Sequence, residues 1–381
     1  VVKIQESAEN YLETIHMLSK HKPYVRSIDI ANELSFSKPS VSVAMKNLRE
    51  NGYIHMDDQG HITLTQTGQD IADKMYERHI MLSNWLIYLG VDEKTAVEDA
   101  CKIEHDLSAE TFEKLVAFAE SQHMLGVLIA RGQGVRADPA KAAALFRAAA
   151  IMGNANAQYD LGRALDWGFG CEENPREALT WFRLAGAQGH VPAQFAVGVA
   201  YAQGRGCEPN LTQAASWLRK AAMSHHAEAA FRLGELYLRP DNPSADNAEA
   251  FRWVAESARA GFVAAQYTLA LFYWAGRAVK RSPRQAYAWA MRAASKDSDA
   301  ALLLLSKLME NGEAGPADAQ TAYALTLRAM DVASNDAAQE EAQLRLRELS
   351  LKLSVESIQS AEEVCKAHPD TTSLLQSLLE S

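Results

Sequence analysis

Apolar residues at the start of the chain recur at the three- and four-residue intervals of an amphipathic helix. The sequence HKPY at 21–24 ends this run, and a second helix is expected at 27–34, followed by a short turn. The apolar positions of the first helix are Ile4, Tyr11, Leu12, Ile15 and Leu18.

A third helix is predicted between Ser37, whose hydroxyl suits a helix cap, and Gly52, which ends it. Pro39 falls in the first turn, where its missing N–H costs nothing. Two strands at 53–56 and 61–64 flank a DDQG sequence suited to a hairpin turn. Helix, short turn, helix and hairpin together predict a winged helix-turn-helix domain in residues 1–64.

The third predicted helix carries side chains that suit the major groove of DNA. Serine hydroxyls can donate to phosphates, lysine and arginine add positive charge, and Pro39 and Val43 can pack on thymine methyl groups. Modest direct specificity is expected, because no Arg or Gln stands at the front of the helix. A winged helix used only for protein contacts is the alternative. The predicted DNA-binding set is Arg26, Ser37, Lys38, Pro39, Ser40, Ser42, Val43, Lys46 and Arg49.

Two further helices, predicted at 67–89 and 93–104, introduce candidate metal ligands. Cys101, Glu104 and His105 stand at positions i, i+3 and i+4, so their side chains leave one face of a helix. Sulfur, imidazole and carboxylate donors suit a late first-row divalent cation, with Fe²⁺ and Mn²⁺ as the cellular candidates.

Candidate ligands also occur earlier in the chain: Asn10 and Glu13 share one face of the first helix, and His79 lies on the helix at 67–89. Each of these residues also has an ordinary structural interpretation. The spacing alone therefore leaves metal binding open.

Residues 108–134 form a junction with apolar positions at helical spacing and no Pro or Gly before Gly126. We interpret them as one continuous helix. Its first half closes the unit at 65–120, and its second half begins a repeat array.

From residue 121 to residue 336 the sequence repeats six times with a period of 36. Small residues at fixed positions allow paired helices to approach closely, and one large side chain per repeat fills the gap to the next pair. The prediction is a right-handed α-solenoid of six helical hairpins that presents a concave face to a protein or peptide. Residues 337–381 are predicted to form capping helices. The clearest ladder is Leu125-Gly126, Leu161-Gly162, Val197-Gly198, Leu233-Gly234, Leu269-Ala270 and Leu305-Ser306.

Several segments carry a family resemblance. SAENYLETIHML, RSIDIANELSFSKPSVSVAMKNLRENGYI, ERH and EDACKIEHDLS, in this order within about residues 3–118, resemble the diphtheria toxin repressor and manganese transport repressor family. The resemblance implies a homodimer, joined through residues 65–120, that binds double-stranded operator DNA when Mn²⁺ or Fe²⁺ is bound and represses metal-uptake genes. It implies an interface that includes Trp85, Leu86 and Tyr88.

The same resemblance implies metal ligands at Glu13, His79, Glu104 and His105, with Cys101 and Asn10 at two further ligand positions. Asn10 stands where the manganese type has an acidic ligand, and Cys101 is the iron-type residue. The mixed set leaves the choice between the two metals open.

The repeat sequence NAQYDLGRALDWGFGCEENPREALTWFRLAGAQGH is similar to the Sel-one-like repeat family, whose solenoids usually present a surface to a partner protein. Some members of this class are reported to bind or cleave β-lactams. No Ser/His/Asp or Cys/His grouping stands out in this chain, so we predict that it is not an enzyme.

The formal net charge of -10 argues against a generic nucleic-acid binder, but the charge is unevenly distributed. Residues 1–50 carry seven Lys and Arg against six Asp and Glu, whereas residues 51–120 carry five against fourteen. No apolar run is long enough to span a membrane, and the first residues do not resemble a signal peptide. Together with four scattered cysteines, these features predict a cytoplasmic protein with reduced thiols and no membrane partner.

The combined prediction is a metal-dependent DNA-binding repressor module fused to a protein-interaction solenoid. The alternative is an interaction scaffold in which the N-terminal unit only dimerises the solenoid. Because the two parts differ in residue usage, we interpret the join as an engineered or assembled chimera, with a natural gene fusion as the alternative.

Overall fold

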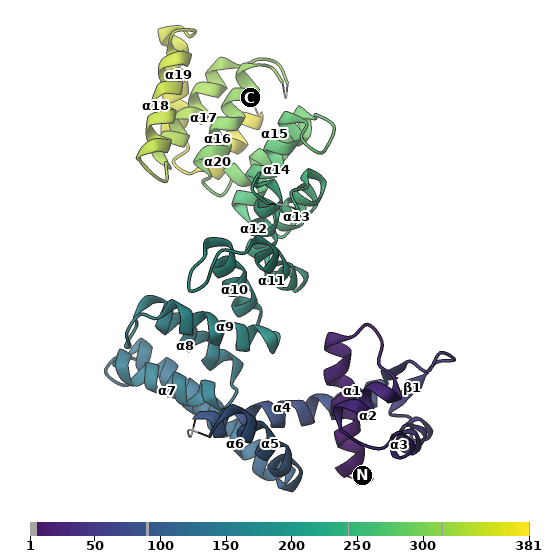
Figure 1. Cartoon of the computed structure of the whole chain (residues 1–381). Helices are drawn as coiled ribbons and strands as arrows, with labels where there is room; N and C mark the ends of the chain where they lie inside the picture. The colour runs from purple at the N-terminus through teal and green to yellow at the C-terminus, as the bar shows by residue number, and fades with distance from the viewer. Residues whose placement is uncertain (1–5, 89–90, 243, 314, 381) are drawn as a thin grey trace. The chain divides into compact units, whose positions relative to one another are not determined.

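A computed structural model describes residues 6–88, 91–242, 244–313 and 315–380. The chain folds as two compact units, Val1–Ala185 and Gly186–Ser381. Twenty helices and one two-stranded sheet account for the regular structure of the described ranges, so the fold is mainly helical, as predicted (Figure 1). Within the same ranges, no helix has both the length and the apolar character needed to cross a membrane.

The first unit begins with the predicted winged helix-turn-helix. An antiparallel hairpin forms the wing, with His55 opposite Thr63, and an isolated bridge from Val25 to Ile62 ties the wing to the segment before the second helix. The core is a single cluster in which Leu12, Ile30 and Met45 are almost fully buried. The elements are α1 (Glu6–His21), α2 (Ser27–Glu33), α3 (Lys38–Glu50), β1 (Ile54–Met56) and β2 (Ile62–Leu64).

The turn between α2 and α3 is tight and contains a non-glycine residue with left-handed backbone. Ser35 has a φ of 55°, in the left-handed region of backbone conformation. Residues other than Gly, Asn and Asp adopt this conformation at a cost in conformational energy. The backbone N–H of Phe36 donates to the carbonyl of Ala31 at 3.0 Å, and the Phe36 ring meets the Tyr11 ring edge-on at 6.0 Å. These contacts hold the turn closed and fix the direction in which α3 leaves the core.

Three helices follow the wing: α4 (Gln66–Tyr88), α5 (Glu93–Asp106) and α6 (Ala109–Arg131). The predicted helix end at Leu89 lies outside the described residues. The Ser108 hydroxyl caps α6 by accepting a hydrogen bond from the Thr111 N–H at 3.1 Å, and left-handed Gly132 ends the helix. The continuous helix predicted across the junction is therefore confirmed.

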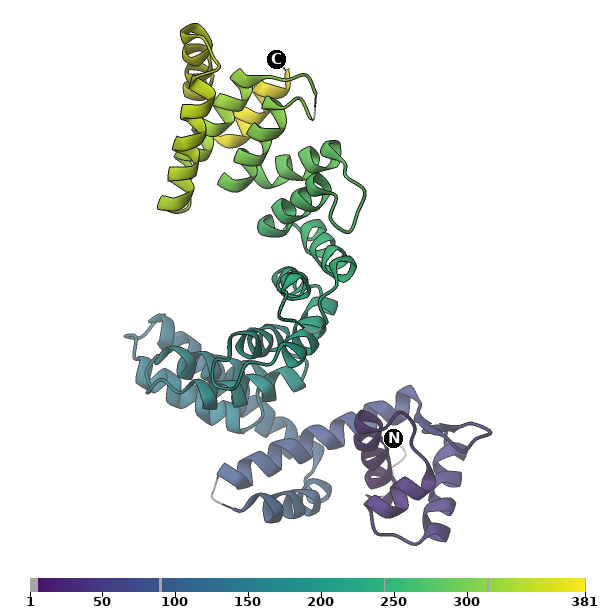
Figure 2. The same ribbon diagram turned by 45° about the horizontal axis from the view of Figure 1, so that its top comes forward.

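Helical hairpins occupy most of the rest of the chain, with consecutive helices paired side by side (Figure 2). In the first unit the paired helices are α6 with α7 (Pro139–Ile151), and α8 (Ala155–Trp167) with α9 (Pro175–Ala187). In the second unit they are α10 (Val191–Gln203), α11 (Leu211–Met223), α12 (Ala227–Leu238), α13 (Asn247–Arg259), α14 (Val263–Ala275), α15 (Pro283–Ala294), α16 (Asp299–Glu310) and α17 (Ala319–Asp331).

The small residue of each repeat faces a side chain twenty positions later, on the second helix of the same hairpin. A Cβ added to Gly126 would lie 2.8 Å from the Phe146 ring, and one added to Gly162 would lie 2.6 Å from the Phe182 ring. Such distances are well inside van der Waals contact, so these positions exclude any side chain.

The second unit uses the same contact with smaller partners. Gly198 faces Leu218, and Gly234 faces Val254. In the last two repeats the small residue is no longer glycine: Ala270 and Ala290, at the same two positions, lie in one buried cluster, and Ser306 pairs with Thr326 through a 2.8 Å hydrogen bond between their hydroxyls. The facing side chains opposite alanine and serine are thus smaller than those opposite glycine.

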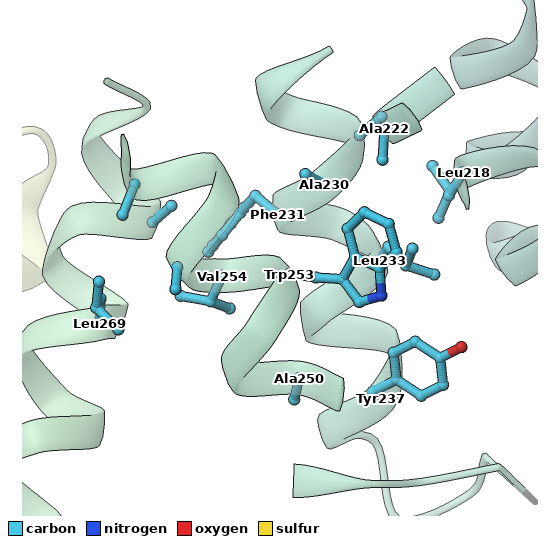
Figure 3. Packing of buried hydrophobic residues seen from close by; sticks show 14 of the residues in the cluster. Leu218, Ala222, Ala230, Phe231, Leu233, Tyr237, Ala250, Trp253, Val254 and Leu269 are labelled. Atoms are coloured by element: carbon cyan, nitrogen blue, oxygen red, sulfur yellow. The ribbon is translucent and has the colours of Figure 1, made fainter. Parts of the chain in front are cut away.

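The large residues of the repeats fill the layer between hairpins. In the second unit the Trp253 indole lies beside Leu233 and Tyr237, with Phe231 and Val254 on adjoining turns (Figure 3). The Trp253 indole N–H donates to the Glu249 carboxylate at 3.1 Å, so the buried ring leaves no unpaired donor.

Three further helices cover the end of the array, as predicted: α18 (Asp336–Ser350), α19 (Val355–Ala367) and α20 (Thr371–Glu380). Helices α18 and α19 pack against α17. Within the second unit, Arg345 of α18 forms an ion pair with Glu310, and Lys352 donates to the same carboxylate at 2.6 Å. The Arg328 guanidinium donates to the backbone carbonyls of His368 and Pro369, which precede α20.

Candidate nucleic-acid interface and metal centre

Helix α3 has one buried face and one fully exposed face. Val41, Met45 and Leu48 are buried at the spacing of one helical face and anchor the helix on the core. The opposite face presents Ser42, Val43, Lys46 and Arg49, all exposed. Val43 is 60% exposed although it is apolar, so the fold itself does not require it there. The predicted DNA-reading face is thus available to a ligand.

The start of α3 is built from two serines. The Ser40 N–H donates to the Ser37 hydroxyl at 3.3 Å, and the two hydroxyls lie 2.7 Å apart. Ser37 is therefore the helix cap, as predicted. Since one hydroxyl proton is used between the two serines, only one of them can donate to a phosphate at a time. Lys38 and Pro39, in the same turn, are both exposed.

Arg26, the remaining residue of the predicted DNA-binding set, lies at the wing. Its guanidinium Nη2 is 3.0 Å from Nε2 of His61, and His61 Nδ1 is 2.9 Å from the Asp57 carboxylate. Arginine can only donate and a carboxylate can only accept, so Nδ1 carries the proton of a neutral His61 ring. Tyr24 stacks on this ring with centroids 4.4 Å apart.

These wing residues line an open hollow of about 600 Å³ together with Asp58 and Gln59. Asp57 accepts hydrogen bonds from the backbone N–H groups of His61 and Gln59 at 2.8 and 2.9 Å, and the first of these is the main reason that its pKa lies below the ordinary value. Sequence reasoning missed Tyr24 and His61. An aromatic residue and a histidine close to a predicted wing turn were the available signal.

The predicted metal ligands lie on three helices, two of which pack against the third. Asn10 and Glu13 lie on α1, His79 on α4 and Cys101 on α5. Helix α4 packs against both α1 and α5, so it is the common partner of the three. Glu13 is buried, with 9% of its surface exposed, whereas Asn10, His79 and Cys101 are half-buried.

The remaining two predicted ligands, Glu104 and His105, lie outside the residues whose side chains the structure describes. Among the side chains that it does describe, no three His, Cys, Asp or Glu residues converge closely enough to hold a metal ion. The ligand set taken from the family resemblance therefore stays a prediction. No disulfide joins the four cysteines, each of which is described.

The contact between α1 and α4 is polar near its centre. The Gln69 side-chain amide donates to His16 Nδ1 at 2.7 Å, and the Asp73 carboxylate lies 3.5 Å from the same nitrogen. Burial, followed by the nearby Lys20 ammonium, lowers the pKa of His16. Lys20 itself lies over the Tyr76 ring, 3.6 Å from its centroid. The lowered pKa favours the neutral form of the His16 imidazole. This imidazole accepts the hydrogen bond from Gln69 and so joins α1 to α4.

Large apolar side chains are exposed on α4, α5 and α6. Trp85 is 43% exposed, Val97 is 42% exposed and Phe118 is 52% exposed. Leu86, also predicted at the dimer interface, is half-buried, and the side chain of Tyr88 lies outside the described residues. Exposed apolar residues on three successive helices suit a protein-protein contact.

Family comparisons agree with this arrangement of parts. The N-terminal DNA binding domain of the iron dependent repressors matches residues 3–62, and the metal binding and dimerisation domain of the same family matches residues 65–123. The Sel1 repeat model matches six consecutive segments: 119–154, 155–190, 191–226, 227–262, 263–298 and 299–331. The chain therefore belongs to the Sel1 repeat proteins and carries both N-terminal domains of the iron-dependent repressor family. The matched families are those of a transcriptional repressor and of a repeat protein.

Individual relatives cover the two parts separately. An HTH-type transcriptional regulator of Methanocaldococcus jannaschii is 37% identical over 120 residues, which is 31% of this chain and 95% of the relative. The transcriptional regulator MntR of Salmonella typhimurium is 34% identical over 119 residues, 31% of this chain and 75% of the relative.

Among solved structures, a Sel1 repeat protein from Oxalobacter formigenes is 26% identical with a TM-score of 0.55, over 64% of this chain and 99% of that one. A protective antigen from uropathogenic Escherichia coli with the same repeat fold has a TM-score of 0.59 at 24% identity, over 82% of this chain and 66% of that one. The chain thus resembles two classes of protein in different parts of its length. The matches to the dimerisation domain and to the first Sel1 repeat overlap at residues 119–123 of α6.

Proposed function

We propose that this chain is a dimeric, metal-responsive repressor that binds operator DNA through α3 and binds a partner protein through its repeats. The observation that carries the proposal is the two-sided character of α3. One face is anchored by buried apolar residues, and the other presents Ser42, Val43, Lys46 and Arg49 to solvent. A helix held in this way at the surface of a winged helix can enter the major groove without rearranging the core.

The proposed contacts with DNA divide into two kinds. Lys38, Lys46 and Arg49 would neutralise phosphates, and each phosphate contact makes affinity fall more steeply as salt rises. Val43 and Pro39 would pack against thymine methyl groups and contribute sequence preference. Arg26, held beside His61 at the wing, would contact the backbone next to the groove that α3 occupies.

The proposed metal ligands fit a divalent cation by their chemistry. A carboxylate buried on α1, an imidazole on α4 and a thiol with neighbouring carboxylate and imidazole groups on α5 form the mixed donor set that Mn²⁺ or Fe²⁺ accepts. Asn10, Glu13, His79, Cys101, Glu104 and His105 would hold the cation, which when bound supplies a cross-link between three helices.

This cross-link would act by population shift. Helix α1 belongs to the winged helix, whereas α5 belongs to the segment proposed to form the dimer. Ligands on both would restrict how the reading helix is oriented relative to a second copy, and favour the orientation that fits one operator. The dimer itself would use residues 65–120, including Trp85 and Leu86. A regulator of this kind would act in the cytoplasm, where it meets chromosomal DNA.

We propose that the join rigidly connects the dimerising segment to the repeats. This role is the same whether the chain is an assembled chimera or a natural fusion. The two family matches overlap on α6, so the repeats continue from the dimerising segment without a flexible linker. A scaffold in which the N-terminal unit only dimerises the repeats would share this architecture. It differs in predicting no effect of metal on DNA binding.

The DNA-binding proposal is tested by selecting duplexes from a random pool with the full chain in Mn²⁺, then measuring binding across a salt series. Lys46→Ala and Arg49→Ala are expected to weaken binding and lower the salt slope by about one unit each. The control is Lys94→Ala, which removes an equally charged and highly exposed lysine from α5. Equal binding by all variants, or binding unchanged by removal of metal, would favour the scaffold.

The metal proposal is tested by calorimetry with Mn²⁺ and Fe²⁺ under anaerobic conditions. Glu104→Ala and His79→Ala are expected to weaken metal binding by about ten- to a hundred-fold, because each removes a direct ligand. Glu110→Ala serves as the control, since it removes an exposed carboxylate from the first turn of α6. Unchanged titrations for both ligand variants would refute the ligand assignment.

A further inference from the structure

The packing of the repeats does not explain Trp167, a large aromatic residue of the second repeat. It is 68% exposed, whereas Trp253 of the fourth repeat is buried. The positions one period before and after it are Arg131 and Gln203, so repeat geometry does not demand an aromatic residue here. An exposed indole that serves no packing role is a common feature of binding surfaces.

Trp167 borders an apolar hollow of about 250 Å³ between α6 and α8, the first helices of the first two repeats. Phe146 is buried beneath it, on the helix that faces Gly126. Val127 and Ala130 of α6 and Ala164 of α8 line the hollow, and Phe169 in the following loop completes its rim. The hollow lies entirely within the first compact unit.

The loop that carries Phe169 is held in one conformation. Phe169 stands between Gly168 and Gly170, which have φ values of 67° and 70°, in the left-handed region that favours glycine. A Cβ at Gly170 would lie 2.0 Å from the carbonyl oxygen of Pro139, so this backbone is packed directly against the start of α7. The aromatic rim is therefore preorganised, which lowers the entropic cost of binding.

The hollow has positive charge on its rim. Arg131 and Arg163 both line it and both are exposed. The Arg163 guanidinium lies over the Trp167 ring at 5.0 Å from the centroid. Asp160 also lines the hollow, but one carboxylate oxygen is 2.9 Å from His123 Nε2 and the other lies 3.9 Å from Arg163. Two guanidinium groups thus face solvent around an apolar centre in a chain whose net charge is -10.

We propose that this hollow binds an acidic peptide segment of a partner protein. One large apolar side chain of the segment would fill the space between Trp167, Phe169 and Phe146. Flanking carboxylates would pair with Arg131 and Arg163, whose planar guanidinium groups suit bidentate contact with carboxylates. The proposal rests on the proposed role of the repeats as a partner-binding surface, and it specifies where the partner binds and by what chemistry.

The test uses the full chain and a C-terminally amidated peptide, Glu-Asp-Asp-Leu-Phe-Asp-Glu-Glu, that carries fluorescein on its N-terminal amine, and binding is followed by fluorescence polarisation. Trp167→Ala and Arg163→Glu are each expected to weaken binding by about ten-fold or more, and Arg163→Lys by less. The control is Arg252→Glu, which reverses an exposed arginine that lies over Trp253 on α13. Circular dichroism of each variant shows whether the repeats remain folded.

Two control peptides define specificity. Replacing Leu-Phe by Ala-Ala should reduce binding by removing the apolar contact, and replacing all carboxylates by lysine should abolish it. No binding of the acidic peptide up to about 1 mM, or equal binding by wild type and Trp167→Ala, overturns the proposal. Tighter binding of a single-stranded oligonucleotide that depends on Trp167 also overturns it, because stacking on a nucleic acid base would then explain the indole.

The outcome is independent of the repressor proposal. Trp167→Ala should leave metal-dependent duplex binding unchanged, because α8 carries none of the proposed DNA or metal contacts. Loss of duplex binding in Lys46→Ala with retained peptide binding would separate the two sites.

Discussion

In the winged helix each packing contact occurs once, whereas in the repeats one contact recurs six times at intervals of 36 residues. Met45 fills a position of the winged-helix core that no other part of the chain reproduces. Gly162 has an equivalent residue in each of the other repeats, and these residues show that the position requires a small side chain. Repetition therefore separates residues that serve the fold from residues that do not, and this separation is the reason for proposing Trp167 as a binding residue.

The repeats also show how a contact tolerates change. From the first repeat to the last, the small side of the helix contact grows from glycine to alanine to serine. The facing side chain shrinks from Phe146 and Phe182 to Ala290 and Thr326. The largest facing side chains thus occur only where the small side is glycine. The winged helix offers no such internal comparison, so the effect of substitutions in its core has to be measured.

The largest effect is expected from Met45→Ala in the winged-helix core. Met45 is 1% exposed, and removing a buried methionine typically costs about 2–5 kcal/mol of the free energy of unfolding. Hydrogen exchange of α1–α3 at increasing denaturant measures the change in that region alone. The matched control is Val43→Ala on the exposed face of the same helix, which should alter stability by less than about 0.5 kcal/mol.

The two variants at α3 should also differ in function. Val43→Ala is expected to weaken duplex binding while leaving stability nearly unchanged, because most of the Val43 surface is exposed in the free protein. Equal loss of exchange protection in both variants would mean that the exposed face contributes to the fold.

A smaller effect is expected from Gly162→Ala in the repeats. The added Cβ would lie 2.6 Å from the Phe182 ring, and overpacking of this kind costs about 1–3 kcal/mol, more than the roughly 1 kcal/mol gained in helix propensity. Ala270→Gly, the reverse change in the fifth repeat, should also destabilise, because it leaves space beside Ala290 and lowers helix propensity. Thermal unfolding monitored by circular dichroism reports both.

A double-mutant cycle makes this comparison sharper. Combining Gly162→Ala with Phe182→Ala places alanine at both positions, as the fifth repeat does with Ala270 and Ala290. The double variant should be more stable than the sum of the single changes predicts, since the overpacking disappears with the ring. Strict additivity would show that the two positions do not share one contact.

Helix caps should give effects of about 1 kcal/mol in both regions. The Asp138 carboxylate accepts a hydrogen bond from the Lys141 N–H at 3.0 Å, and Ser37 caps α3 in the same manner. Asp138→Ala removes the acceptor and should cost about 1 kcal/mol, whereas Asp138→Asn retains one and should cost a few tenths. Equal thermal stability of the two variants would contradict a capping role.

Much of this architecture could be predicted from sequence because its determinants are local or periodic. The continuous helix α6 follows from uninterrupted apolar spacing, and the caps of the second helices follow from an Asp, Asn or Ser at one phase of the repeat. The six caps are all present, with side-chain acceptors at Asp138, Asn174, Asn210, Asp246, Ser282 and Asp318.

A second ladder went unnoticed although its signal was periodic. Gln158, Gln194 and Gln266 are buried and donate to the backbone carbonyls of Ala150, Gly186 and Ala258, eight residues earlier, at 3.0 to 3.2 Å. Glutamine at one phase of three repeats could have indicated this role.

The wing and the metal ligands depend on contacts between distant segments, which spacing does not encode. Arg26 meets His61 because the bridge between Val25 and Ile62 brings residues 35 positions apart together. The proposed metal centre depends on where α1 and α5 cross α4 and on the side chains of Glu104 and His105. Family resemblance supplied that ligand set, and local sequence patterns did not.

The smallest expected effect is a pH dependence at the C-terminal end of the array, where α18 covers the last repeat. Burial disfavours ionisation of Glu310, but hydrogen bonds from Lys352 and Arg345 outweigh it and hold the pKa of this carboxyl below its ordinary value of 4.5. A lowered pKa in the folded state means that the ionised form stabilises the fold. This stabilisation is fully present above the ordinary pKa and is lost as the pH falls through the lowered value. Glu310→Gln should therefore destabilise the second unit near pH 7, and its effect should shrink as the pH falls through the lowered pKa of Glu310. Chemical denaturation of both proteins from pH 7 to pH 3 measures the difference, and a difference that does not change with pH would show that Glu310 acts through packing instead of charge.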